Sequence, residues 1–151
     1  MRKIIAGYKA SVVIMHMQGK PKTMQKNPVY KDVVEDIKLF FTERIAKAKE
    51  AGIKDIIIDP GIGFGKTAEH NLQILKRLRE FTSFGFPVLV GPSRKSFISK
   101  VTEAAESERL EGTLAAVSIA VMKGAGIVRA HDVKETKRAV QMVDAIKNVS
   151  T

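Results

Sequence analysis

Residues 55–67 read DIIIDPGIGFGKT, and this stretch decides the interpretation of the fold. Its three consecutive isoleucines form a continuous apolar run, which is typical of a short strand in a parallel sheet covered on both faces. Pro60 and the glycines after it end the run, because proline and glycine favour turns. The helical pattern that follows contains Leu72, Leu75 and Leu78. The stretch therefore predicts one unit of strand, glycine-rich loop and helix.

The same unit recurs along the chain. Apolar runs that predict strands lie at residues 11–15, 55–58, 87–90 and 126–128. Helical patterns lie at residues 31–51, 72–78, 109–123 and 133–147. An alternation of strand and helix requires right-handed crossovers between parallel neighbours. We therefore predict a single α/β domain over residues 1–151, built on a parallel sheet.

Several of these helices carry sequence signals for their packing and their ends. One apolar face of the helix at 31–51 is formed by Val34, Ile37, Phe41, Ile45 and Ala48. The corresponding face of the helix at 109–123 is formed by Leu110, Leu114, Val117 and Val121. Gly52 and Gly124 stand where a left-handed residue ends a helix. Asp132 and Glu135 have the spacing of a capping box at the start of the last helix.

The opening of the chain predicts an incomplete architecture. Residues 1–9 resemble the tail of a helix that leads into the first strand. Four parallel strands leave unpaired edges and uncovered apolar faces, which a soluble protein has to hide. We therefore expect either a partner that covers these surfaces or the remaining units of a barrel.

Composition narrows the class of protein. The 151 residues are 44% hydrophobic and 28% charged, with no cysteine, which is ordinary for a globular protein of the cytoplasm. No apolar run approaches the ~18 residues of a membrane helix. The net charge of +10 favours anionic partners. The chain has no Trp and only two Tyr, so a base-stacking surface for nucleic acid is not expected.

The glycine-rich loop is not a nucleotide motif. A P-loop requires glycine five residues before Gly65, and Pro60 takes that place. The dinucleotide fingerprint requires a third glycine where Lys66 stands. What remains is either an ordinary flexible loop or three glycines around Phe64 that let the backbone approach a flat ligand.

Polar side chains follow each predicted strand at the edge where sites of parallel α/β proteins form. Asp59 either caps the following turn or accepts hydrogen bonds from the N–H groups of a heterocycle. Residues 93–96 read SRKS, with Lys95 among them, and Arg129 and His131 alternate out of the last strand, so both can point to one side. If these strands form the second half of a barrel, the three basic residues converge on an anion, as at the usual phosphate site of such barrels.

These motifs together resemble dihydropteroate synthases. The resemblance covers essentially the whole chain and is carried by residues 15–25 (MHMQGKPKTMQ), 59–66 (DPGIGFGK), 93–96 (SRKS), 111–113 (EGT) and 129–133 (RAHDV). It implies the C-terminal half of a TIM (β/α)8 barrel, about four βα units. It also implies a transferase of folate biosynthesis and a sulfonamide target, which joins 6-hydroxymethyl-7,8-dihydropterin diphosphate to 4-aminobenzoate and releases pyrophosphate.

The resemblance assigns roles to individual residues. It implies that Asp59 accepts hydrogen bonds from the amino-pyrimidine edge of the pterin and that Lys95 donates to the opposite edge. Arg129 would stack on the pterin and, with His131, hold the leaving pyrophosphate, so that Lys95, Arg129 and His131 form the catalytic set. The substrate-binding set is Met15, Asp59, Gly63, Phe64, Gly91, Ser93, Lys95, Ser96, Arg129 and His131. Of these, Phe64, Lys95 and Ser96 would border the 4-aminobenzoate pocket, and Met15 would pack against the pterin ring.

The family pattern also includes parts that lie outside this sequence. Mg²⁺ is expected in the full enzyme, and the strand-end Asn that serves it has no counterpart here, so no metal ligand is expected in this segment. We therefore expect little activity from the chain alone. We also expect a homodimer or association with a complementary half. The alternatives are a pterin domain that presents a methyl group to a corrinoid protein and a basic, non-enzymatic binding module.

Overall fold

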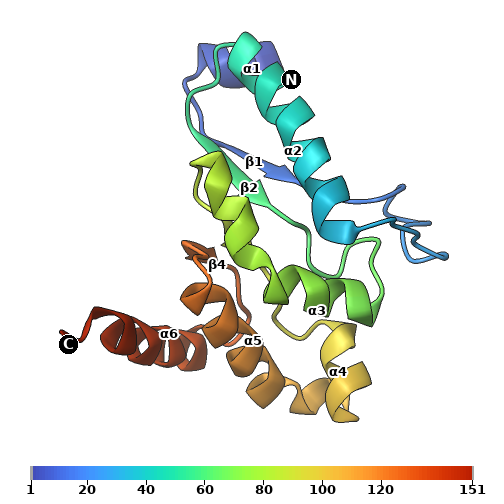
Figure 1. Ribbon diagram of the computed structural model, residues 1–151, viewed down its shortest axis with the longest axis vertical. Helices are drawn as coiled ribbons and strands as arrows, with labels where there is room; N and C mark the ends of the chain where they lie inside the picture. The colour runs from blue at the N-terminus through green and yellow to red at the C-terminus, as the bar shows by residue number, and fades with distance from the viewer. Residues whose placement is uncertain (1, 151) are drawn as a thin grey trace.

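The computed structural model describes residues 2–150 and shows four short strands that alternate with helices (Figure 1). The strands are β1 (Val12–Met15), β2 (Ile56–Asp59), β3 (Leu89–Val90) and β4 (Ile127–Val128). The helices are α1 (Arg2–Gly7), α2 (Val33–Glu50), α3 (Ala68–Lys76), α4 (Ser96–Thr102), α5 (Leu110–Met122) and α6 (Val133–Asn148). Two 3-10 segments, at Leu78–Phe84 and Glu106–Glu108, join them. The predicted helix before the first strand is confirmed as α1.

All four strands are parallel and lie side by side in the order of the sequence. β1 pairs with β2 from Val12 opposite Ile56 to Met15 opposite Asp59. A single bridge, between Ile58 and Val88, connects β2 to β3, and Leu89 lies opposite Ile127 on β4. A doubly wound sheet would reverse its strand order at a switch point, whereas a sequential parallel order is the arc of a barrel. The predicted α/β class and parallel sheet are confirmed.

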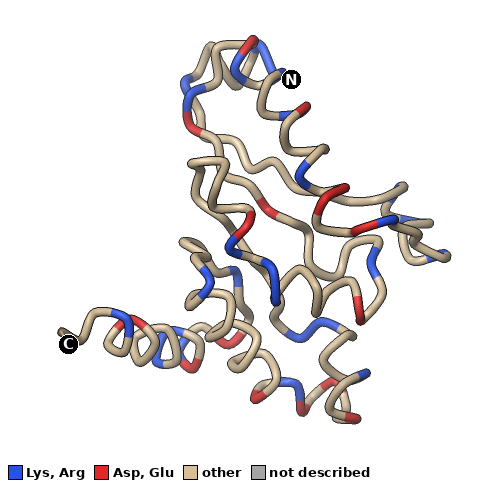
Figure 2. The backbone as a smooth tube through the Cα atoms, viewed as in Figure 1, with Lys and Arg blue, Asp and Glu red and all other residues tan. Residues whose placement is uncertain are grey.

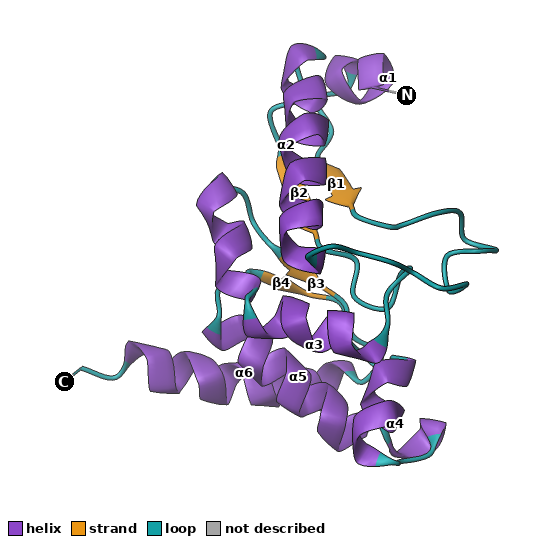
Figure 3. Ribbon diagram, turned by 45° about the vertical axis from the view of Figure 1, so that its right-hand side comes forward, coloured by secondary structure: helices purple, strands orange, loops and turns teal. Residues whose placement is uncertain are grey.

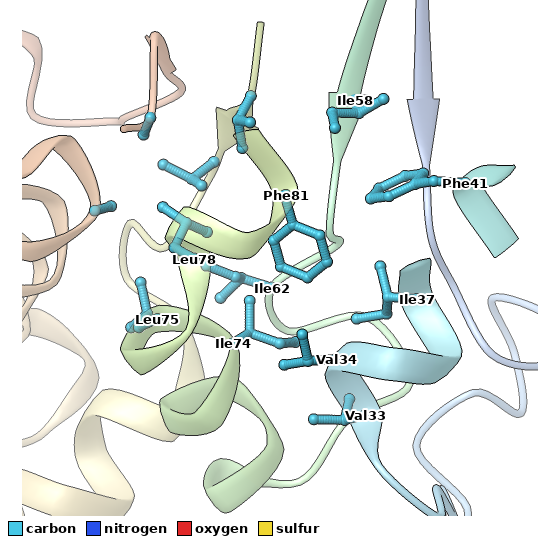
Figure 4. Packing of buried hydrophobic residues seen from close by; sticks show 14 of the residues in the cluster. Val33, Val34, Ile37, Phe41, Ile58, Ile62, Ile74, Leu75, Leu78 and Phe81 are labelled. Atoms are coloured by element: carbon cyan, nitrogen blue, oxygen red, sulfur yellow. The ribbon is translucent and has the colours of Figure 1, made fainter. Parts of the chain in front are cut away.

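Helices pack on one face of this arc and form the main core there. Ile56, Ile58, Val88 and Val90 point into that core and are nearly inaccessible to solvent. Figure 4 shows Ile58 of β2 with Phe41 of α2 and Phe81 of the first 3-10 segment, and the two phenyl rings meet edge to face with centroids 5.9 Å apart.

The opposite face of the arc differs from the sequence prediction of strands covered on both sides. Val13, which alternates with the core residues of β1, is 42% exposed, and Ile57 and Ile127 are only half-buried. Within residues 2–150 the helices therefore cover one face, and the other is the inward face of the barrel arc. Figure 3 shows the strands beside α2, and the loop after β1 projecting away from the helices.

Helix α2 follows from its sequence at both ends and along its apolar face. The carboxylate of Asp32 accepts hydrogen bonds from the backbone N–H groups of Val34 and Glu35 at 2.9 and 3.1 Å. Gly52 has a φ of +81°, so it ends the helix in the left-handed conformation, as predicted. The predicted apolar face is confirmed, because all its members are buried: Val34, Ile37, Phe41, Ile45 and Ala48.

Other helix predictions were wrong in detail. The helix after β2 ends at Lys76, and Leu78, predicted on the same helix as Leu72 and Leu75, lies in the 3-10 segment that follows. Of the face predicted for the helix at 109–123, only Val117 and Val121 are buried. Asp132 caps no backbone N–H of α6, because its carboxylate binds Arg94 instead. Helix α4 was not predicted, because its seven residues are too few for an apolar period to stand out.

Charged residues are spread over the molecule. Figure 2 shows Lys and Arg distributed over helices and loops, with Asp and Glu among them. Arg77 binds Asp32, Glu35 and Glu80, and so ties α2 to the end of α3. Across residues 2–150, none of the helices combines the length and apolar character that crossing a membrane requires.

The cap of α2 provides a stability test. We expect Asp32→Ala to lower the free energy of unfolding by about 1–2 kcal/mol, because two N–H groups of the first turn lose their acceptor. Asp32→Asn is the matched control: it keeps a capping oxygen and removes only the ion pair with Arg77, so its effect should be smaller. Chemical denaturation followed by circular dichroism measures both, and equal losses would contradict the capping argument.

Candidate active site

A pocket of about 260 Å³ opens where β2, β3 and β4 end. Its lining residues are Asp59, Ile62, Phe64, Gly91, Ser93, Lys95, Arg129, Ala130 and His131. They come together because parallel strands have their carboxyl ends at the same edge of the sheet. Seven of the ten predicted site residues line this one pocket: Asp59, Phe64, Gly91, Ser93, Lys95, Arg129 and His131.

Asp59 caps the turn after β2 and also lies in the pocket lining. It is 4% exposed, and its Oδ1 accepts a hydrogen bond of 2.8 Å from the N–H of Gly61, which fixes the turn after β2. The same side chain lines the pocket. Burial raises the pKa of the Asp59 carboxyl, while the Gly61 hydrogen bond and the charges of Arg129, Lys66 and Lys95 act in the opposite direction. The site thus contains a buried carboxylate whose ionisation depends on nearby cations.

Lys95 lines the pocket together with an aromatic partner. Its ammonium nitrogen lies 4.1 Å from the centre of the Phe64 ring, a cation–π contact. Gly63 does not line the pocket, but a Cβ there would come within 2.7 Å of Cδ of Lys95. The glycine therefore makes room for the lysine stem. Burial lowers the pKa of Lys95, and the carboxylate of Asp59 opposes that shift.

His131 is held by a residue of the neighbouring strand end. Oγ of Ser93 accepts a hydrogen bond of 3.1 Å from the backbone N–H of His131 and lies 2.9 Å from its Nδ1. These contacts orient the imidazole toward the pocket that Arg129 also lines. The predicted convergence of Arg129 and His131 on one side of β4 is present in the structure.

Besides Gly63, two predicted site residues lie outside the pocket lining. Met15 lies on β1 opposite Asp59 in the parallel register, one strand beyond those that form the pocket. Ser96 begins α4, and its side chain is exposed to solvent. Their proposed contacts with substrate therefore depend on ligand or protein atoms that extend past this pocket.

The loop of residues 93–96 is fixed from behind by residues that the sequence reasoning did not assign. The N–H of Arg94 donates to Oγ1 of Thr113 at 3.1 Å, and Arg109 donates to the carbonyl of Arg94 at 2.8 Å. The guanidinium of Arg94 binds Asp132, which joins this loop to the one after β4. A Cβ at Gly112 would meet Cγ2 of Ile98 at 2.4 Å, so α5 can pack this closely only with glycine. Gly112 and Thr113 of the EGT motif thus support the loop of residues 93–96.

A second support lies under the glycine-rich loop, where Lys66 is 4% exposed. Its ammonium group donates to the carbonyls of Gly61 and Phe64, both at 3.0 Å, and contacts Nδ1 of His16 at 3.0 Å. Burial, with the charge of Lys66 acting in the same direction, lowers the pKa of His16 to about 3. Sequence reasoning missed this pair, because a lysine between a glycine and a threonine gives no sign of burial.

Two amides complete the loop framework. Oδ1 of Asn71 accepts from the N–H of Gly63 at 2.7 Å. The side chain of Gln25, in the loop after β1, donates to the carbonyl of Gly63 at 2.7 Å. Gly63 is thus held on both its backbone groups, and the loops after β1 and β2 are joined to each other.

The pocket does not fit a protein-bound Mg²⁺ ion. Mg²⁺ prefers several oxygen ligands in octahedral geometry, whereas Asp59 is the one acidic residue in the lining. Residues 2–150 contain no cluster of three or more His, Cys, Asp or Glu with metal-binding geometry. The basic groups around the pocket instead favour an anion.

An arc of parallel strands whose ends surround one carboxylate and several basic groups defines an α/β-barrel site for a ligand with an anionic part and a hydrogen-bonding edge. The model of the pterin binding enzyme family matches residues 1–131, and the chain belongs to that family. The resemblance stated from the motifs is confirmed, since its curated relatives are dihydropteroate synthases.

Two kinds of comparison support this assignment. The dihydropteroate synthase of Escherichia coli (strain K12) is 51% identical over 136 residues, which cover 89% of this chain and 48% of the relative. The Yersinia pestis enzyme in complex with a sulfonamide drug has a TM-score of 0.95 at 42% identity, covering 98% of this chain and 55% of that one. The Thermus thermophilus enzyme in complex with 4-aminobenzoate has a TM-score of 0.93 at 39% identity, covering 98% and 61%. The chain spans about half the length of the curated relatives it matches.

The buried His16 predicts a loss of stability in acid. Between pH 6.5 and about pH 3 the unfolded chain binds a proton at His16 and the folded chain does not, so falling pH favours unfolding in this window. The slope should reach at most about 1.4 kcal/mol per pH unit. His16→Asn keeps an acceptor for Lys66 and cannot titrate, so its unfolding free energy should fall less. Denaturation at several pH values measures this, and parallel curves would refute it.

Gly61 predicts a steric requirement that a matched glycine lacks. A Cβ at Gly61 would lie 1.9 Å from the carbonyl oxygen of His16, whereas one at Gly85 would meet nothing within 4 Å. Both residues have positive φ, +71° and +74°. We expect Gly85→Ala to destabilise by about 1 kcal/mol through backbone strain alone, and Gly61→Ala by at least about 3 kcal/mol. Thermal or chemical unfolding compares the two, and similar losses would rule out the clash.

Proposed function

We propose that this chain supplies the pterin and diphosphate side of a dihydropteroate synthase. The observation that carries the proposal is that Asp59, Lys95 and Arg129 line one pocket although they lie far apart in the sequence. Membership of the pterin-binding enzyme family supports the ligand class. In the proposed reaction, 6-hydroxymethyl-7,8-dihydropterin diphosphate and 4-aminobenzoate give 7,8-dihydropteroate and pyrophosphate.

The two edges of a pterin match the two kinds of group in the pocket. The hydrogen bond from Gly61 uses Oδ1 of Asp59, which leaves Oδ2 to accept from the amino-pyrimidine N–H groups. Lys95 donates to the carbonyl and ring-nitrogen side. Phe64, held against Lys95, provides an apolar wall beside the second substrate. We assign 4-aminobenzoate to that side, with Ser96 at its rim.

The chemistry requires stabilisation of a leaving anion. Cleavage of the carbon–oxygen bond transfers negative charge to the pyrophosphate, and fixed cations around it lower the barrier. We assign this role to Arg129 and His131, which both line the pocket, and the guanidinium plane of Arg129 can also stack on the pterin. The neutral aromatic amine is itself nucleophilic, so the proposal requires no general base. We place any Mg²⁺ on the diphosphate, held by groups other than these side chains.

The whole activity depends on more than these residues. Because the chain spans about half of its curated relatives, we propose that turnover requires a complementary half or a second copy of the chain. Exposed apolar residues on α5 and α6, including Ile119 and Met142, are consistent with such a contact. Release of pyrophosphate rather than transfer of a methyl group would distinguish this function from that of a corrinoid-linked pterin domain.

Binding to the 151-residue chain tests the assignment of the two ligand parts. We expect 6-hydroxymethylpterin, followed by its fluorescence, to bind at least about tenfold more weakly to Asp59→Asn and Lys95→Ala, since the first loses a buried acceptor oxygen and the second loses a donor. Inorganic pyrophosphate, followed by calorimetry, should bind more weakly to Arg129→Ala and His131→Ala.

Lys134→Ala is the matched control, because it removes one positive charge from an exposed position on α6. It should leave both affinities unchanged. The proposal fails if the unmodified chain binds neither ligand at millimolar concentration. It also fails if binding depends only on salt and is insensitive to changes at Lys95 and Arg129, which would favour a non-specific basic module.

A further inference from the structure

Lys66 is a buried cation that the proposed reaction does not use. It is 4% exposed and is not among the residues that line the pocket. Lysine is almost never fully buried unless its charge is compensated. The acceptors that surround Lys66 therefore call for an explanation beyond packing.

The contacts of Lys66 match a charged ammonium group. Its three nearest acceptors, the carbonyls of Gly61 and Phe64 and Nδ1 of His16, each lie at 3.0 Å, and an ammonium group has three N–H bonds to donate. His16 can accept at Nδ1 only when this nitrogen carries no proton, and burial lowers the pKa of His16 to about 3. Below about pH 7 the two residues thus form a charged donor and a neutral acceptor.

Gly61 connects Lys66 to the ligand-facing carboxylate. Its carbonyl accepts from Lys66 at 3.0 Å, and its N–H donates to Oδ1 of Asp59 at 2.8 Å. Gly61 has a φ of +71°, and a Cβ on its α-carbon would clash with the carbonyl of His16, so only glycine fits at this junction. Lys66 therefore holds Gly61, and Gly61 in turn holds the carboxylate of Asp59.

The charges around Asp59 differ in what happens to them when a ligand binds. Arg129 and Lys95 face the pocket, so a diphosphate would neutralise their charges and add negative charge near Asp59. Lys66 is not among the residues that line the pocket, and it contacts backbone carbonyls and His16 instead. A ligand in the pocket would therefore not neutralise Lys66, whose positive charge can still stabilise the carboxylate of Asp59.

We propose that Lys66 is a positioning residue that keeps Asp59 ionised and oriented toward the pterin edge while the diphosphate occupies the other cations. This inference rests on the proposed function of the pocket. The titratable groups that face Lys66 are Asp59, His16 and, at the start of α3, His70. Burial lowers the pKa of Lys66 to about 7, and the carboxylate of Asp59 opposes that shift.

The test compares a charge change with a structural change on the same loop. Lys66→Gln removes the charge and retains a donor, whereas Asn71→Ala removes the hydrogen bond to Gly63 and changes no charge. Carbon-13 NMR of the Asp59 carboxyl in the ligand-free chain follows its titration directly. We expect Lys66→Gln to raise the pKa of Asp59 by about one unit or more, and Asn71→Ala to leave it in place.

Ligand binding gives the second readout. The acid limit of 6-hydroxymethylpterin binding should move to higher pH in Lys66→Gln by the same amount, and further when pyrophosphate is present. Unchanged titration of Asp59 in folded Lys66→Gln, or an equal shift in Asn71→Ala, would overturn the inference. An unshifted acid limit of binding would overturn it as well.

Two further outcomes separate the inference from the proposed function. If the unmodified chain binds no pterin, the proposed function fails, while the titration of Asp59 still decides whether Lys66 controls its charge. If Lys66→Gln does not fold, the unmodified chain suffices: the Asp59 signal should show a second inflection near pH 7 as Lys66 loses its proton. The absence of that second inflection would count against the inference.

Discussion

The site depends on the parallel register of β2, β3 and β4. Because all strands run in one direction, their carboxyl ends meet at one edge, and residues far apart in the chain, such as Asp59 and Arg129, line one pocket. Register matters as much as direction, since a slip of one residue would turn Asp59 toward the helices and Ile58 toward the ligand. Burial of the apolar side chains on the helix-covered face therefore sets the register, and the register sets the direction in which the polar side chains of the site point.

The polar side chains of the pocket lie on loops that follow the strands, and buried polar contacts hold these loops in place. Lys66 with His16 holds the loop after β2, and Arg109 with Thr113 holds the loop after β3. A buried charge is costly to desolvate, so such networks are weak contributors to net stability. Their effect is to restrict geometry, which a site for a planar ligand requires.

Much of this architecture could be predicted from the sequence, and the exceptions share a physical origin. Strands, the face of α2 and the strand-end residues follow from local periodicity and from the topology of parallel sheets. The burial of Lys66 does not, because only the folded chain brings three acceptors to it. Asp132 has the spacing of a helix cap, but the competing guanidinium of Arg94 comes from another strand end. Local signals fail where a distant partner offers a stronger contact.

On the inward face of the arc, apolar strand residues are followed, two positions later, by residues of the pocket. Two residues after Ile57 on β2 stands Asp59, two after Leu89 stands Gly91, and two after Ile127 stands Arg129. Side chains two apart on a strand point the same way, so one row of apolar residues lies directly beneath one row of ligand-facing residues. β1 differs, because the residue two positions after Val13 is the apolar Met15. This strand contributes no lining residue to the pocket. Burial raises the pKa of Asp59, and the carboxylate lies where Arg129, Lys66 and Lys95 act against that shift.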